Sequence, residues 1–161
     1  MFSVLAELFV KFNIQSLRVM INILATQTAL VCALHHLHGN HLFKLIVEQV
    51  VKSYLAPLGD CDPEERLEQR KNAVNVMAYM YLFGSITVFF VKELVEELVS
   101  DVDSWKAELL FQLIGAVGSH IRSDDPKTLK DIIDVVKAKI EQARSTTLQG
   151  NKKVGYIIED L

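Results

Sequence analysis

The chain has 161 residues, of which 50% are hydrophobic and 23% are charged, and its formal net charge is −3. This composition excludes an intrinsically disordered chain, and the length is enough for one domain with a contiguous core. The lack of a basic excess argues against general nucleic-acid binding but allows a local basic patch. Cys32 and Cys61 form no Cys-x-x-Cys pattern, so we expect reduced thiols in a cytosolic or nuclear compartment, with Cys32 packed in the core.

Apolar residues recur at helical spacing along the chain, and strand-like alternation is scarce, so the sequence predicts an all-α fold. The predicted helices, in chain order, cover residues 2–12, 15–36 (broken near 25–26), 41–55, 63–83, 85–100, 104–120, 126–144 and, after a polar linker, 151–161.

Turn and capping signals separate these helices. Gly39-Asn40 and Gly84-Ser85 indicate turns, and Asp62 and Asp125 each precede a proline, which is typical of a capped helix start. Asp101 or Asp103 is expected to cap the helix that begins at Ser104. Long helices joined by short loops predict a single domain over residues 1–161, built as a HEAT-like stack of antiparallel helical hairpins, an α-solenoid.

Two stretches without Asp, Glu, Lys or Arg, residues 20–43 and 72–91, are long enough to span a bilayer. The first contains several amides and histidines, which makes it a poor span. The second could instead be two buried helix ends that meet at Gly84-Ser85, and its amphipathic flanks favour that interpretation. We therefore expect no membrane partner, although a small membrane protein stays open as an alternative.

A histidine-rich segment is the one candidate metal site in the sequence. Its potential ligands lie within ten residues and are Cys32, His35, His36, His38 and His41. Their spacing suits zinc, but we favour a helix end that enters a polar turn, so we predict no metal.

No catalytic motif is present. The paired carboxylates are Glu64-Glu65, Glu96-Glu97 and Asp124-Asp125, and they suit helix starts and solvated faces better than a pocket. There is no glycine-rich phosphate loop and no serine nucleophile motif. The sequence therefore predicts no enzyme, no cofactor and no small-molecule substrate.

An ordered series of motifs resembles a known family. The motifs are Gly-Ser-His-Ile-Arg-Ser-Asp-Asp-Pro at 118–126 with Leu-Lys-Asp-Ile at 129–132, Leu-His-His at 34–36, the helix from His41 to Lys52, Lys-Asn at 71–72 leading to Met-Tyr-Leu-Phe at 80–83, and the basic-then-apolar segment 152–159. This series is similar to the middle domain of eukaryotic initiation factor 4G (MIF4G), and most of all to the nucleolar members involved in small-ribosomal-subunit biogenesis. The match covers residues 25–161, whereas residues 1–24 match poorly, Leu82 stands where the family usually has Asn, and Gly155 stands where it has a larger residue.

The resemblance implies a non-enzymatic scaffold in the nucleolus or nucleus. It would bind a DEAD-box RNA helicase of the initiation-factor-4A type, modulate its ATPase cycle during ribosomal RNA processing, and contact pre-ribosomal RNA or particles. A related adaptor role in translation initiation or splicing is the alternative. The resemblance also implies an array of hairpins that is incomplete at both ends. In this family hairpin ends face the helicase, so we expect partner contacts at Arg122, Asp124, Asp125, Lys127 and Lys130, with helix capping as the alternative role of the two aspartates.

Overall fold

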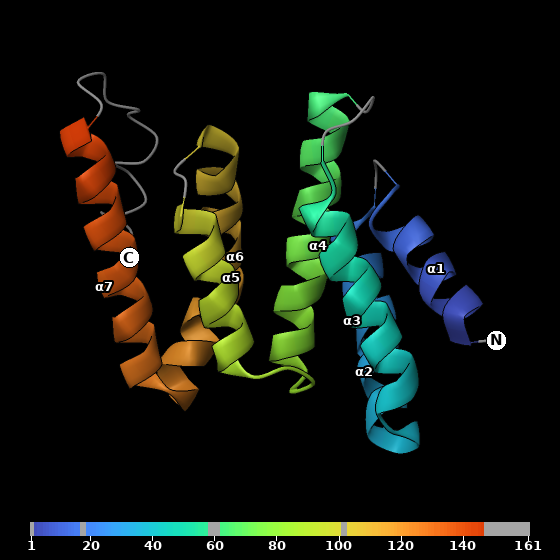
Figure 1. The fold of residues 1–161 in the computed structure, drawn as a ribbon. Coiled ribbons are helices and arrows are strands. Elements are labelled where there is room, and N and C mark those ends of the chain that lie inside the picture. Colours follow the sequence, from blue (N-terminus) through green and yellow to red (C-terminus); the bar gives the residue numbers. More distant parts are fainter. Residues whose placement is uncertain (1, 17–18, 58–61, 101–102, 147–161) are drawn as a thin grey trace. The chain divides into compact units, whose positions relative to one another are not determined.

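Figure 1 shows the computed structural model of the protein, which describes residues 2–16, 19–57, 62–100 and 103–146. These residues form seven α-helices and no strand. The helices are α1 (Phe2–Asn13), α2 (Ile21–His38), α3 (Asn40–Leu55), α4 (Pro63–Leu82), α5 (Val88–Ser100), α6 (Ser104–Asp124) and α7 (Pro126–Thr146). The predicted all-α fold of adjacent helical hairpins is confirmed. None of the described helices is both long and apolar enough to cross a membrane.

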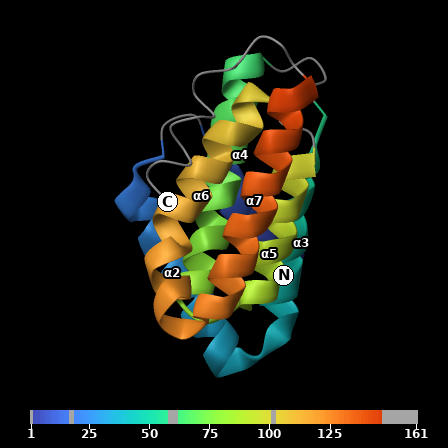
Figure 2. The same ribbon diagram turned by 90° about the vertical axis from the view of Figure 1, so that its left-hand side faces the viewer.

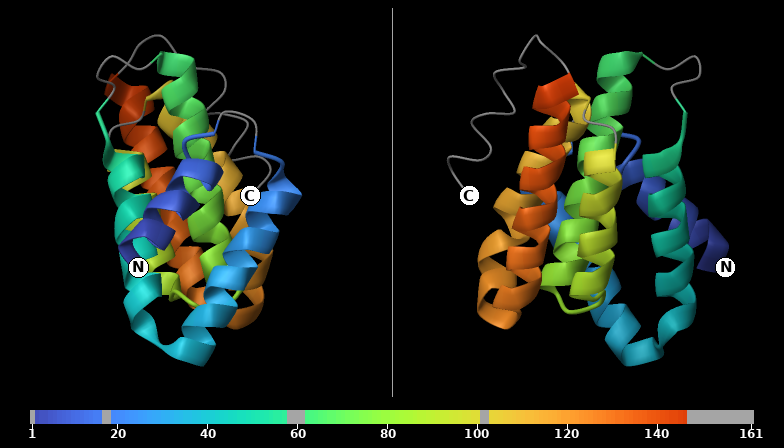
Figure 3. Two further views of the ribbon diagram at one scale, coloured as in Figure 1. Left: turned by 90° about the vertical axis from the view of Figure 1, so that its right-hand side faces the viewer. Right: turned by 60° about the vertical axis from the view of Figure 1, so that its left-hand side comes forward.

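The chain divides into two compact units, residues 1–86 and 87–161. In the first unit α2 and α3 form a hairpin around Gly39, whose φ of +85° is a left-handed conformation that favours glycine. Helix α1 packs on α3 at one side of this hairpin, and α4 packs on both α2 and α3 at the other side (Figures 1 and 3). The core of this unit therefore lies along both sides of the α2–α3 hairpin.

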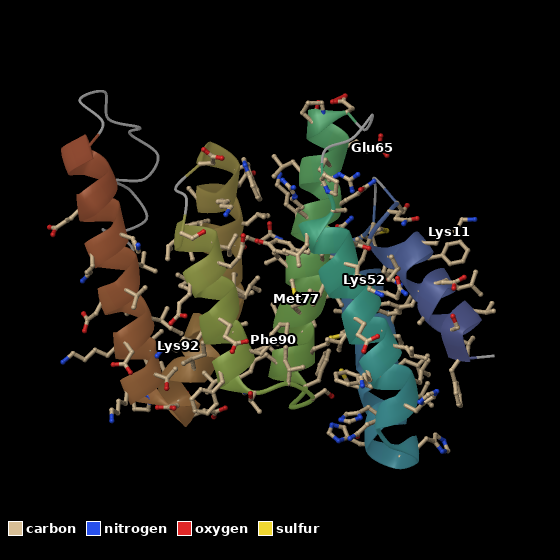
Figure 4. The ribbon with its side chains drawn as sticks, in the orientation of Figure 1. Lys11, Lys52, Glu65, Met77, Phe90 and Lys92 are labelled. Carbon is tan, nitrogen blue, oxygen red and sulfur yellow. The ribbon has the colours of Figure 1, made fainter. Side chains whose placement is uncertain are left out.

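Helix α4 supplies much of the first core. It starts at Asp62, whose Oδ1 accepts a hydrogen bond of 3.0 Å from the Glu64 amide, and Pro63 occupies the first turn as predicted. Its side chains Val74 and Met77 are buried, and Met77 is labelled in the C-terminal half of the helix in Figure 4. The helix ends at Leu82, and Gly84, with φ +69°, forms the predicted turn. The charge-free stretch 72–91 thus contains the end of one helix and the start of the next.

In the second unit α5, α6 and α7 pack against one another in pairs (Figure 2). The predicted inward positions of α5 are confirmed for Val91 and Val95, and the predicted apolar face of α7 is buried at Leu129, Ile132 and Val136. Leu113, Val117 and Ile121 of α6 complete this core, because positions three or four residues apart share one face of a helix.

Several predicted helix boundaries were wrong. Helix α2 begins at Ile21 and runs without a break, and the Thr26 hydroxyl, near the predicted break, donates to the Asn22 carbonyl oxygen at 2.8 Å within the helix. Helix α5 begins at Val88, after the turn at Gly84, and α6 continues beyond residue 120 to Asp124. Asp103 precedes α6 as predicted, but its side chain makes no capping hydrogen bond.

At the end of the chain, α7 includes residues 145 and 146, which the sequence had assigned to a linker. The predicted helix over 151–161 lies outside the described residues. The prediction of one domain over residues 1–161 is not tested by these boundaries and stays a prediction.

Candidate partner-binding surface

The five predicted contact residues gather where α6 ends and α7 begins. Asp125 alone connects these helices, so the turn is tight. Around it Arg122, Asp124, Lys127 and Lys130 are exposed, whereas Asp125 is partly buried. The structure thus presents four charged side chains of both signs near one end of the α6–α7 hairpin.

Asp125 acts as the cap of α7. Its Oδ1 accepts a hydrogen bond of 3.0 Å from the Thr128 amide, and its Oδ2 accepts one of 2.7 Å from the Thr128 hydroxyl. The Leu129 amide donates to the Asp125 carbonyl oxygen, which starts the helix. The Thr128 side chain and amide lower the pKa of Asp125, because they stabilise its charged form. These contacts match the capping role that the sequence left open as the alternative.

The remaining charges at this turn face solvent. Asp124 pairs with His120 on the preceding helical turn, with 3.1 Å between His120 Nε2 and Asp124 Oδ2. Exposed pairs of this kind add little to stability because water screens them. Exposed charges of mixed sign can instead set the orientation and the association rate of a partner of complementary charge.

Sequence reasoning missed a buried polar anchor in the first unit. Asn72 is only 8% exposed, and its Nδ2 donates to the carbonyl oxygens of Ile14 at 3.3 Å and Ser16 at 3.1 Å. These bonds tie the residues after α1 to α4. The Lys71-Asn72 motif therefore includes a structural residue, and the signal for it in the sequence was an amide at the start of the charge-free stretch 72–91.

A second missed contact lies in the second unit. Lys106 is only 8% exposed, and its Nζ lies 3.0 Å from Glu97 Oε1 and donates at 3.2 Å to the Glu97 carbonyl oxygen. Glu97 belongs to a carboxylate pair that the sequence placed on solvated faces. Its side chain is 37% exposed, and its carboxylate also links the end of α5 to the first turn of α6.

The histidine-rich segment has packing roles. Cys32 is buried as predicted, and burial raises the pKa of its thiol although a hydrogen bond with Ser85 opposes this. The His35 ring stacks on Phe43, with 4.3 Å between ring centroids, and His36 Nε2 lies 3.4 Å from Ser85 Oγ. Within the part of the chain that the structure describes, no three His, Cys, Asp or Glu side chains are grouped to hold a metal ion.

Comparison with known proteins gives several distant relatives. The chain is 23% identical over 137 residues to "Suppressor of glycerol defect protein 1" of Schizosaccharomyces pombe, covering 83% of this chain and 17% of that protein. It is 26% identical over 123 residues to the "Nucleolar MIF4G domain-containing protein 1 homolog" of Drosophila melanogaster, covering 76% and 14%. With "Nucleolar MIF4G domain-containing protein 1" of Mus musculus the identity is 25% over 132 residues, covering 82% and 15%.

The chain spans about one-sixth of the length of these curated relatives. No family model matches it, and no solved structure matches it. Two of these relatives are named for a nucleolar MIF4G domain, in agreement with the resemblance seen in the motifs. Over about four-fifths of its length, the chain is a distant homologue of the nucleolar MIF4G domain-containing proteins.

Proposed function

We propose that the chain is a non-enzymatic scaffold that binds a DEAD-box RNA helicase of the initiation-factor-4A type and modulates its ATPase cycle. The setting is ribosomal RNA processing and small-subunit biogenesis in the nucleolus, with pre-ribosomal RNA or particles nearby. The distant homology to proteins named for a nucleolar MIF4G domain carries this proposal. The packed helical hairpins support it, because they offer a firm surface and carry no recognisable catalytic motif.

A scaffold can change an ATPase cycle without doing chemistry. A DEAD-box helicase has two lobes that open and close as nucleotide binds and leaves. A protein that binds one arrangement of the lobes more tightly shifts the population toward it, by as much as the two affinities differ. The scaffold therefore needs only a contact surface of defined shape and charge.

The end of the α6–α7 hairpin is our candidate for part of that surface. Arg122, Asp124, Lys127 and Lys130 are exposed there and are held at the ends of two packed helices. Asp125 contributes indirectly, since its carboxylate is engaged by Thr128 and fixes the start of α7. We assign it a positioning role.

The test uses the full chain and a purified helicase of the initiation-factor-4A type, with a pull-down and RNA-stimulated ATPase kinetics. The wild type should bind and change the ATPase rate, and the Arg122→Glu, Lys130→Glu double variant should bind at least about 10-fold more weakly. Lys44→Glu is the matched control, because the Lys44 side chain is 75% exposed on α3. Absence of binding and of any rate change with the wild type would overturn the proposed function. Unchanged binding by the double variant would overturn only the assignment of the surface.

A further inference from the structure

We draw no further inference here: the strongest candidate, the apolar groove that α1, α2 and α3 form in the first unit, is an unpartnered apolar face, and nothing in the structure shows what covers it.

Discussion

Removal of the Asn72 side-chain amide should destabilise the first unit by about 2 kcal/mol. In the folded protein this amide donates at 3.3 Å and 3.1 Å to the carbonyl oxygens of Ile14 and Ser16. A hydrogen bond of this kind contributes about 1 kcal/mol net, so Asn72→Ala loses about 2 kcal/mol and leaves two acceptors without this donor. With a urea m-value of about 2 kcal/mol/M, the unfolding midpoint falls by about 1 M.

Asn72→Asp separates the hydrogen bonds from simple loss of volume. The shape is nearly unchanged, but at neutral pH a carboxylate faces two carbonyl oxygens, so this variant should be less stable than Asn72→Ala. The environment raises the folded pKa of the new carboxyl above its unfolded value of about 3.9. The penalty relative to wild type is therefore full above the folded pKa and shrinks as pH falls through it, because the protonated carboxyl can donate one bond.

The assay is urea unfolding followed by circular dichroism at several pH values. Asn22→Ala serves as the control, because Asn22 is exposed on α2 and its loss should move the midpoint little. If Asn72→Ala unfolds at the wild-type midpoint, the two bonds do not stabilise this unit and the reasoning fails.

Two further predictions concern caps and turns. Asp125→Ala should lower the melting temperature at pH 7 more than Asp124→Ala. Since the folded pKa of Asp125 is lowered, this difference should be complete above the ordinary aspartate pKa of 3.8 and shrink as pH falls through the folded pKa. A pH-independent difference would contradict the capping role. Gly84→Ala should destabilise by about 1 kcal/mol because φ is +69°, whereas Gly115→Ala, inside α6 with open space at its Cβ, should stabilise by about 0.5–1 kcal/mol. Equal thermal shifts for the two glycines would show that backbone conformation does not decide the effect.

Local signals explain the parts of the fold that the sequence predicted well. The Asp-Pro pairs at 62–63 and 125–126 mark the starts of α4 and α7, because capping depends on residues within one helical turn. Gly84 and Gly39 mark turns because their conformations are open mainly to glycine. Such features require no knowledge of the neighbouring helices.

Tertiary contacts explain what the sequence could not predict. Helix α1 has apolar residues on most of its sides, so spacing alone cannot tell that Ala6 and Val10 are buried while Leu5 and Leu8 line an open groove. The acceptors for Asn72 lie more than fifty residues earlier in the chain, and only packing brings them together. The contacts of Lys106 with Glu97 at the end of α5 likewise depend on the packing of α5 against α6, which no local pattern in the sequence predicts.

Several residues of the motifs that resemble the MIF4G family have structural roles in this fold. Asn72 holds the residues after α1, Asp125 caps α7, and His35 stacks on Phe43. A distant relative can keep such residues to preserve its helices while it changes partner, so these positions argue for fold more strongly than for helicase binding. Under the proposed function, partner choice depends on exposed side chains, for which Arg122 and Lys130 are our candidates. A variant at those two positions that loses helicase binding but melts like wild type would therefore be evidence of function, whereas loss of binding by Asn72→Ala would report only unfolding.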